Sequence, residues 1–534
     1  MLLLLLMLCL YVCHALSPDP TVTSPSGKYR GTTLTSPAGL SYNAFLGIPF
    51  ALPPTGTLRF AKPIPYPPIS GTYDAIHTGP VCIQPLGVDL GAPADENCLY
   101  LNVYVPRHNK EGKLKKVLVY IHGGAYFLGS ANLQVPGDLV SQNDVIVVTF
   151  NYRLSYLGFL KGNCSDYPGN QGFWDQILAL KWVKDNIRSF GGDADDVTVG
   201  GESAGSESIS ALSITRQARH LFTKAVLLSG TVFSNLYSIN NSDEIVRDFV
   251  TNTVGCKSPD LSKRFQCLQS LPARAFVLPV SLSLRTLLIS VDGELFPAPI
   301  AQLVKNTSYL KEVGFFERDY LVSSVSNEGA IVLHGVFTTG LEPRNVTASQ
   351  LSQVIPQPVS TSQAMLDFYS GIDLPFLPLY GILGDWIFTI PDLNFLRIFS
   401  SQGTSSSHKA YYMMFNYFPT YLPPLLKGFP HAFDLCYLFD LKPRDLLTLY
   451  YYLEADSGFQ LIDVNMKTRY MRIIKDFMCS GHPGVSLSKD LNITWRPYDG
   501  QSENFLEFSD VPAVLQHPIN QRKNFWHTLL NDNL

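Results

Sequence analysis

The stretch Val197-Thr-Val-Gly-Gly-Glu-Ser-Ala-Gly205 decides the fold of this chain of 534 residues. Its β-branched start predicts a strand, and Ser206–Ile214 predicts a helix directly after it. Between them lies the spacing G-x-S-x-G, typical of a sharp strand-to-helix turn. This turn is so tight that small residues must flank Ser203, which accounts for the glycines and alanine. The hydroxyl of Ser203 would project above a sheet, where the helix N-terminus favours negative charge. The pattern therefore predicts a nucleophilic serine.

Composition indicates a large globular protein. The chain is 46% hydrophobic and 16% charged, which suits a substantial core. Its length alone would suggest roughly three or four domains. However, no linker, charge block or internal repeat divides it, so we predict one domain over residues 16–534. The net charge is −4, and no cluster of Lys and Arg could follow a phosphate backbone, which argues against nucleic acid as a partner.

The first fifteen residues, 1–15, form an apolar run that ends near the small residue Ala15. It is too short to span a bilayer, and we interpret it as a signal peptide although a positive start is missing. A buried N-terminal segment is the alternative. No later run of about 20 apolar residues exists, so a transmembrane anchor is not expected. A secreted protein is the simplest interpretation. Five glycosylation triplets fit that route: Asn163, Asn240, Asn306, Asn345 and Asn492.

Seven cysteines follow the predicted signal peptide. One pair brackets a 15-residue loop and another a 10-residue loop, so both are candidates for local disulfides in an oxidising compartment: Cys82 with Cys98, and Cys256 with Cys267. An odd number remains, so at least one thiol is expected to be free among Cys164, Cys436 and Cys479. No spacing of Cys and His resembles a zinc site, and neither a metal nor a cofactor is expected.

Strands alternate with helical stretches along the chain, which predicts an α/β fold with a mostly parallel central sheet flanked by helices. Residues 28–60 are predicted to form edge strands and turns. The amphipathic stretch Trp174–Ser189 predicts a helix, and the segments 230–320 and 342–395 are interpreted as insertions above the sheet. Besides the strand before Ser203, the predicted strands are Leu101–Val105, Lys116–His122, Val145–Tyr152, Ala225–Ser229, Tyr320–Val325 and Ala410–Tyr417.

A nucleophilic serine needs a base, and the base needs an acid that orients it. In α/β-hydrolases the chain order is serine, acid, histidine. Glu328 follows a predicted strand, and His431 lies in a proline-rich loop after a later one, so we predict a Ser203–Glu328–His431 triad. The other histidines are weaker candidates for the base. His334 follows the acid too closely, and His408 lies in a Ser-rich loop. The remaining ones lack a strand–loop setting: His482, His517 and His527.

Acyl transfer also needs donors for the oxyanion of its tetrahedral intermediate. Tyr120-Ile-His-Gly-Gly-Ala-Tyr126 follows an apolar strand and has the form of an HGG-type oxyanion loop. An ordinary tight turn is the alternative, but the position upstream of the serine turn favours the functional interpretation. We therefore expect the oxyanion to be held by the backbone N–H groups of Gly124, Ala125 and Ala204.

Several separated motifs together resemble the type-B carboxylesterase and cholinesterase family. Phe190–Gly205 matches its serine-centred signature, and Glu96–Val103 resembles its second signature, with Asn97 where an aspartate is usual. The resemblance runs from about residue 20 to Trp526. It includes, in the right order, Asn151-Tyr-Arg153, Pro168-Gly-Asn170, Trp174-Asp-Gln176, Ser229-Gly230, Asp292-Gly293 and Asn524-Phe-Trp526.

The resemblance implies an α/β-hydrolase fold with an active-site gorge that takes small-molecule or lipid esters. It implies pairing of Cys82 with Cys98 and of Cys256 with Cys267. It also implies a buried structural ion pair between Arg153 and Asp175. Close to the triad, Glu202 and Ser229 are expected, with the Glu202 carboxylate tuning the electrostatics around the histidine; the alternative is that Glu202 only fills a permissive position in the turn.

Departures from the family pattern bear on the substrate. Ala125 replaces a glycine of the oxyanion loop but keeps a backbone N–H. The loop Ile83–Asn97 contains no tryptophan, which similar cholinesterases use to bind choline by cation–π contact. A third cholinesterase disulfide is also missing. We therefore predict a secreted carboxylesterase, although four aromatic residues remain possible replacements for that tryptophan: Tyr126, Phe127, Trp386 and Tyr417.

Two other classes compete with this interpretation. A lipase-like enzyme for long-chain or sterol esters would differ in its dependence on acyl length, which the sequence does not reveal. A non-catalytic adhesion protein on the same fold would typically lack the nucleophile and carry a membrane span, and this chain has Ser203, Glu328 and His431 and no such span.

Overall fold

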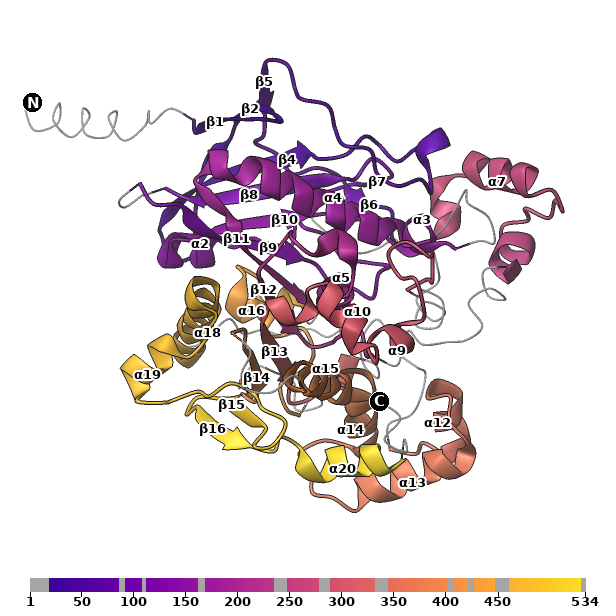
Figure 1. The fold of residues 1–534 in the computed structure, drawn as a ribbon, viewed down its shortest axis with the longest axis vertical. Coiled ribbons are helices and arrows are strands. Elements are labelled where there is room, and N and C mark those ends of the chain that lie inside the picture. Colours follow the sequence, from indigo (N-terminus) through magenta and orange to yellow (C-terminus); the bar gives the residue numbers. More distant parts are fainter. Residues whose placement is uncertain are drawn as a thin grey trace, which may run out of the picture.

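An eleven-stranded sheet runs through the middle of the molecule (Figure 1), in the order β16-β15-β14-β13-β12-β11-β9-β10-β8-β4-β3. The computed structural model describes residues 19–85, 92–107, 112–161, 169–234, 247–277, 289–331, 344–401, 407–419, 422, 427–446 and 461–529. The predicted signal peptide, Cys164, Asn163, Asn240 and His334 therefore lie outside the described residues.

The centre of the sheet is parallel and its two edges are antiparallel. The parallel strands are β9 (Lys115–Ile121), β10 (Ile146–Phe150), β11 (Gly192–Glu202), β12 (Lys224–Leu228), β13 (Asp319–Val325), β14 (Ala410–Phe415) and β15 (Asn504–Phe508). Antiparallel pairing adds β8 (Tyr100–Pro106), β4 (Ser41–Pro49), β3 (Thr32–Thr35) and β16 (Ala513–Gln516). Strands β10, β12 and β14 are buried at every residue. This burial explains their nearly continuous apolar sequences.

Two small sheets lie outside the central one. The first contains β1 (Thr21–Ser24), β2 (Gly27–Arg30) and β5 (Thr72–Asp74), and the second β6 (Val81–Cys82) and β7 (Ala94–Asp95). The disulfide Cys82–Cys98 begins at the end of β6, and Cys256–Cys267 closes the second short loop, as the resemblance implies. Among the described cysteines, Cys436 and Cys479 are free thiols.

Helices cover both faces of the central sheet (Figure 1). The longer ones are α4 (Gln171–Asn186), α5 (Ala204–Ser213), α7 (Leu261–Ser270), α13 (Val359–Ser370), α15 (Ile390–Ser400), α18 (Leu461–Ser480) and α20 (Asn520–Leu529). The shorter ones are α2 (Gly137–Asn143), α3 (Ser155–Phe159), α9 (Ile300–Leu303), α10 (Thr307–Glu312), α12 (Ala348–Val354), α14 (Pro378–Gly384), α16 (Leu435–Leu438) and α19 (Val485–Leu491).

Short 3-10 turns occur at η1 (Gly56–Leu58), η2 (Ile187–Phe190), η3 (Arg216–Ala218), η6 (Ala273–Phe276) and η7 (Phe315–Glu317). Single π-helical turns occur at η5 (Phe249–Thr253) and η8 (Asp385–Thr389). None of the helices in the described ranges combines the length and the apolar character needed to cross a bilayer.

The predicted strands other than the one before Ser203 coincide with observed ones to within two residues at either end, whereas that strand, β11, begins five residues before the predicted Val197. The predicted helix Trp174–Ser189 instead begins at Gln171 and ends at Asn186, followed by the 3-10 turn η2. The helix begins three residues before the predicted Trp174, because Asn170 adopts the left-handed conformation, with φ of 63°, and the helical backbone starts directly after it. The segments interpreted as insertions contain helices between the strands, namely α7, α9 and α10 in the first and α12, α13 and α14 in the second.

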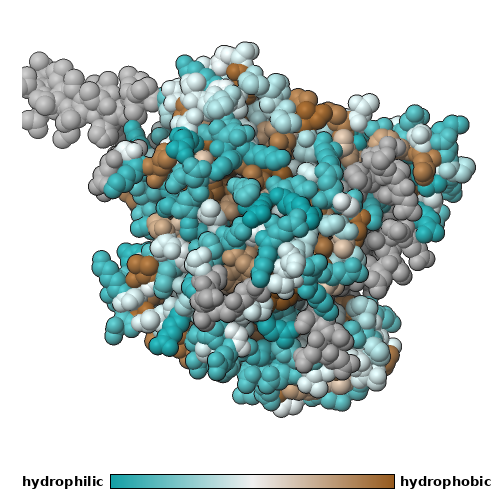
Figure 2. All heavy atoms as spheres, viewed as in Figure 1, coloured by the Kyte–Doolittle hydropathy of each residue, from teal (hydrophilic) through white to brown (hydrophobic). Residues whose placement is uncertain are grey.

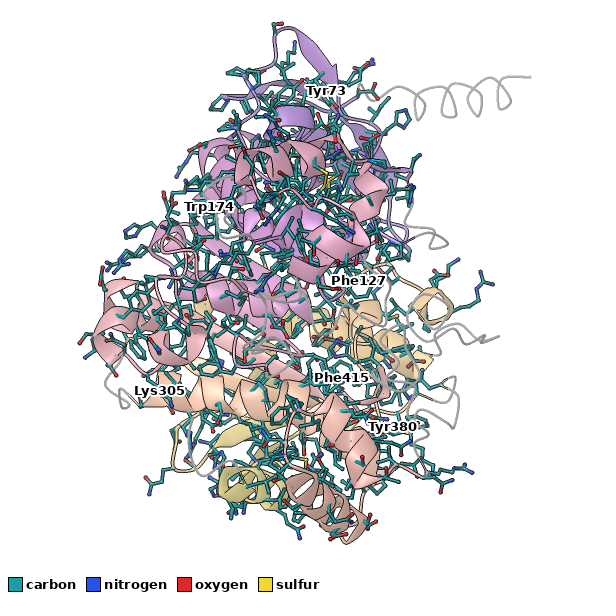
Figure 3. All side chains as sticks on the ribbon, turned by 90° about the vertical axis from the view of Figure 1, so that its right-hand side faces the viewer. Tyr73, Phe127, Trp174, Lys305, Tyr380 and Phe415 are labelled. Carbon is teal, nitrogen blue, oxygen red and sulfur yellow. A yellow bond between two sulfur atoms is a disulfide. The ribbon has the colours of Figure 1, made fainter. Side chains whose placement is uncertain are left out.

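Aromatic side chains fill much of the core. Figure 3 shows Phe127 and Phe415 in the interior and Lys305 toward the edge of the molecule. Phe415 stacks on Phe429 at 4.2 Å between ring centroids, which packs the end of β14 against the loop that carries His431. On the face shown in Figure 2, hydrophilic residues predominate and apolar ones form small groups.

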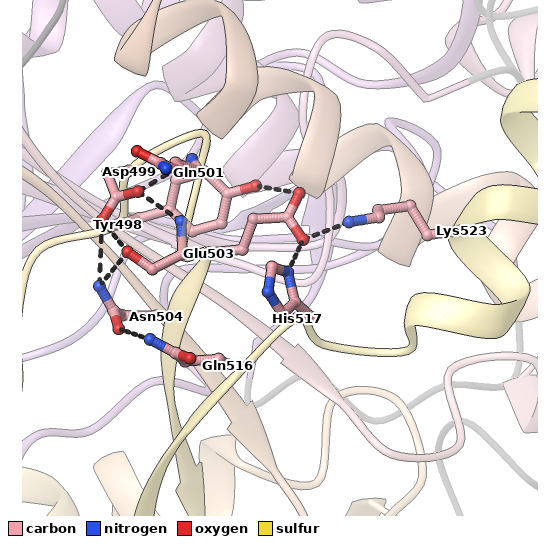
Figure 4. Close-up of polar contacts among 9 residues, drawn as sticks. Tyr498, Asp499, Gln501, Glu503, Asn504, Gln516, His517 and Lys523 are labelled. Atoms are coloured by element: carbon pink, nitrogen blue, oxygen red, sulfur yellow. Dashed lines mark hydrogen bonds and ion pairs between the residues drawn. The ribbon is translucent and has the colours of Figure 1, made fainter.

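A polar cluster fixes the beginning of α20 (Figure 4). The carboxylate of Glu503, just before β15, forms an ion pair with Lys523 of α20. The same carboxylate contacts His517 Nδ1 at 3.2 Å and accepts from the Tyr498 hydroxyl at 3.4 Å. The C-terminal helix is therefore tied to the last strands of the central sheet.

Candidate active site

Ser203 occupies the sharp turn between β11 and α5 that the sequence predicts. Its φ of 55° and ψ of −125° are unusual for a residue with a side chain, and such strain is common at functional sites. A Cβ at Gly205 would lie 2.1 Å from the Ile121 carbonyl oxygen, and one at Gly201 would lie 2.7 Å from the Gly205 carbonyl carbon. Only glycine fits at these two positions. Ser203 is 8% exposed, so the site lies below the surface.

Glu328 and His431 meet as a buried acid–base pair. His431 Nδ1 lies 2.6 Å from Glu328 Oε2, and the second oxygen, Oε1, accepts from the Val325 N–H at 2.8 Å. The two loops are held side by side because Asn327 bridges to Pro430 and its N–H donates to the Phe429 carbonyl at 3.0 Å. The turn after β13 therefore places Glu328 next to the loop that carries His431.

The other nitrogen of His431, Nε2, lies 2.9 Å from Glu202 Oε1. Glu202 precedes Ser203 directly, so this contact brings the imidazole to the serine turn. Burial lowers the pKa of His431, but the charges of Glu202 and Glu328 outweigh it and raise that pKa to about 10. Burial also raises the pKa of Glu202, against the opposing effect of His431. The site can thus hold a proton between two carboxylates.

Sequence reasoning missed a further buried carboxyl, Asp434. It follows His431 by three residues and accepts from the Tyr470 hydroxyl at 3.2 Å. Burial, followed by the charges of Glu202 and Glu328, raises the pKa of Asp434 to about 7. The signal that could have found it is its position one turn after the predicted base.

The predicted oxyanion loop packs against the serine turn. A Cβ at Gly123 would lie 3.1 Å from Ser203 Cβ, so the loop and the serine are in close contact. Gly124 has φ of 102° and Ala125 has φ of 48°. Ala204 is the first residue of α5, where a backbone N–H has no partner within the helix. The three proposed donors therefore lie on segments that adjoin the serine.

The competing histidines lie in other surroundings. His408 Nδ1 lies 3.5 Å from Asp319 at the opposite, amino-terminal end of β13. His482 Nδ1 accepts from the Gly484 N–H, and His517 contacts Glu503. Of the described histidines, His431 is the one in contact with Glu328 and Glu202.

The ion pair between Arg153 and Asp175 and the position of Ser229 were both expected from the family resemblance. Arg153 donates from Nε and Nη2 to the Asp175 carboxylate at 2.8 and 2.7 Å, and the two side chains are 3% and 0% exposed. Ser229 is buried with φ of 56°, and its N–H donates to the Ser323 carbonyl at 2.7 Å at the carboxyl end of β12. Ser229 thus lies at the same edge of the sheet as Ser203.

Three of the glycosylation asparagines are within the described residues, and Asn306, Asn345 and Asn492 are all exposed. Asn306 also accepts from the Tyr309 N–H through its side-chain oxygen and caps α10. The described residues contain no cluster of His, Cys, Asp or Glu arranged to bind a metal ion.

A mostly parallel sheet, a serine in a sharp strand-to-helix turn and a Glu–His pair at the same sheet edge define an α/β-hydrolase. The chain belongs to the carboxylesterase family, whose profile matches residues 18–526. It is accordingly a carboxylic ester hydrolase.

Curated relatives agree with this membership. Carboxylesterase 3 of Pongo abelii is 29% identical over 98% of this chain and 94% of its own length. Esterase FE4 of Myzus persicae is 37% identical over 50% of this chain and 48% of its own length. Acetylcholinesterase-1 of Trittame loki is 43% identical over 44% of each chain.

Proposed function

We propose that this protein is a secreted serine carboxylesterase that works through a Ser203–Glu328–His431 triad and an acyl-enzyme intermediate. The observation that supports it most is the 2.6 Å contact between Glu328 and His431, made beside a serine in a sharp turn. Glu328 accepts from Nδ1 of the ring, so Nε2, which lies 2.9 Å from Glu202 Oε1, is the nitrogen that would serve as the base.

In the proposed first step, His431 takes the proton of Ser203, and the serine oxygen attacks the ester carbonyl. The developing oxyanion accepts hydrogen bonds from the N–H groups of Gly124, Ala125 and Ala204. His431 then gives the proton to the departing alcohol. In the second step a water, activated by the same imidazole, attacks the acyl-enzyme, and the carboxylic acid leaves with Ser203 restored.

Secretion and glycosylation are part of the proposal. The apolar start of the sequence, two disulfides and three exposed glycosylation asparagines support an oxidising compartment. A cholinesterase is the second candidate, because one relative with that name is 43% identical over part of the chain. A lipase-like enzyme remains the alternative for long acyl chains.

The test uses an organophosphate and a p-nitrophenyl ester with the full-length protein. We expect the organophosphate to label Ser203 and abolish hydrolysis, and Ser203→Ala to lose several orders of magnitude in kcat. Ser210→Ala, a change at a buried serine of α5, the helix that follows Ser203, serves as the control and should keep its activity. Full activity in Ser203→Ala, or labelling of another residue, would refute the proposed mechanism.

A further inference from the structure

The π-helical turn η8 between α14 and α15 adjoins the acid of the proposed triad. π turns within helices are frequent at functional sites. A Cβ at Gly384, directly before the turn, would lie 3.2 Å from Glu328 Cβ. A cavity of about 10 Å³, at the lower limit for one water molecule, is bordered by Glu328, Asp385 and Thr389. The turn therefore lies directly behind the acid.

Phe388, in the same turn, covers one face of the His431 ring. The two ring centroids are 4.3 Å apart and the ring planes are tilted by 31°. Phe388 is 4% exposed and His431 is 1% exposed, so water is excluded from this face. The carboxylates of Glu328 and Glu202 hold the two nitrogens at the edge of the ring. The imidazole could still tilt or flip about these contacts, and the phenyl ring against its face limits both motions.

Contacts from three other parts of the chain fix the turn itself. Arg522 of α20 donates from Nη1 to Asp385 Oδ1 at 3.1 Å, and the Tyr369 hydroxyl of α13 donates to Asp385 Oδ2. The Ser234 hydroxyl donates to the Ile387 carbonyl at 2.7 Å. These contacts hold the turn at Asp385 and Ile387, both just before Phe388, and so support the segment that carries the phenyl ring.

We propose that Phe388 is a positioning residue that keeps the His431 imidazole aligned between Ser203 and Glu328. The inference rests on the proposed function, because it requires His431 to be the base. Proton transfer is sensitive to alignment, and a misplacement of about 1 Å can cost about a hundredfold in rate. A flat, rigid ring against the imidazole face maintains the alignment through acylation and deacylation. The role does not require Phe388 to touch the ester.

The test replaces the flat ring by a flexible side chain in Phe388→Leu. The matched control is Phe395→Leu in α15, where the ring is also buried but packs against Tyr320 at 5.0 Å. For acetyl and butyryl p-nitrophenyl esters we expect kcat of Phe388→Leu to fall about ten- to hundredfold for both, with KM changed less than about threefold. Phosphorylation by an organophosphate, which needs the same base, should slow in parallel.

A spectroscopic measurement reports the position of the ring without any substrate. The proton between His431 Nδ1 and Glu328 Oε2 is expected to give a downfield NMR resonance, because the hydrogen bond is short and involves charge. Phe388→Leu should broaden this resonance by exchange with water, and Phe395→Leu should preserve it. Thermal unfolding of both variants separates this effect from loss of stability.

Three results would overturn the inference. They are an unchanged kcat in Phe388→Leu, an equal loss of kcat in both variants, and a rise in KM that grows with acyl length while kcat is retained. The last result would make Phe388 a wall of the substrate site. Phe388→Met replaces Phe388→Leu if the latter does not fold. Failure of the proposed function is recognised separately, by hydrolysis that survives Ser203→Ala.

Discussion

His431 is held at both nitrogens by carboxylates, at 2.6 Å by Glu328 and at 2.9 Å by Glu202. The first carboxylate is the partner that the proposed mechanism needs. The second stabilises the protonated imidazole and therefore opposes its use as a base. Burial raises the pKa of Glu202, against the opposing effect of His431. The pair is expected to titrate as a unit.

Glu202→Gln removes one negative charge beside the imidazole. The pKa of His431 is raised by that charge, so it should fall in the variant. Because the base must be unprotonated, kcat/KM rises with pH through this pKa. We therefore expect the acid limb of the pH–rate profile to move to lower pH, by about one unit or more. At its own optimum, Glu202→Gln should lose less activity than Ser203→Ala.

The control for this measurement is Glu317→Gln, in an exposed ion pair with Arg219. Its acid limb should coincide with that of the unmodified enzyme. A profile of Glu202→Gln identical to the control would mean that Glu202 only fills the turn.

At the scale of elements, the Arg153–Asp175 pair joins the segment after β10 to helix α4. Both side chains are buried, and Asp175 also accepts from the Arg153 N–H at 3.0 Å. Asp175→Asn leaves a buried charge without its partner, which should cost about 3–5 kcal/mol of unfolding free energy. Denaturant unfolding measures the loss. Asp195→Asn, in the exposed contacts with Lys184 and Arg188, should change it little.

Activity distinguishes a structural role from a catalytic one at this pair. Asp175→Asn protein that remains folded should keep its kcat. Normal stability with lost catalysis would contradict the structural assignment.

The elements that could be predicted are those with a local sequence pattern, such as an apolar run or glycines at a turn. Continuous apolar runs indicated the central strands, and Gly201 and Gly205 marked the turn around Ser203. The π turn Asp385–Thr389 could not be predicted, because its extra residue is accommodated by packing against other segments. For the same reason the sequence did not indicate Phe388, because the His431 ring against which it packs is distant in the chain.

For the molecule as a whole, the composition of one loop bears on the preferred ester. The loop between Cys82 and Cys98 offers no tryptophan for a quaternary ammonium, and a desolvated cation–π contact is worth about 2 kcal/mol. We therefore expect choline esters to bind about thirtyfold more weakly than they would with that contact. Of the possible aromatic replacements, Phe127, Tyr126 and Trp386 are all buried, at 0%, 3% and 6% exposed.

The measurement compares kcat/KM for butyrylthiocholine and for a neutral butyryl thioester of similar size. The neutral compound should be preferred. A strong preference for the choline compound would favour a cholinesterase, and rates that keep rising with acyl length would favour a lipase-like enzyme.

The separation of Glu328 from His431 by 103 residues has a consequence for folding. In the folded protein β14, which lies between them in the sequence, pairs with β13 and so helps bring the two loops together. A long loop must close before the hydrogen bond between Glu328 and His431 forms, and such distant contacts form slowly. During synthesis, the segment with Ser203 emerges well before the segment that completes the site. Hydrolysis would therefore report late assembly of the chain, and a partly folded molecule would keep its serine while remaining inert.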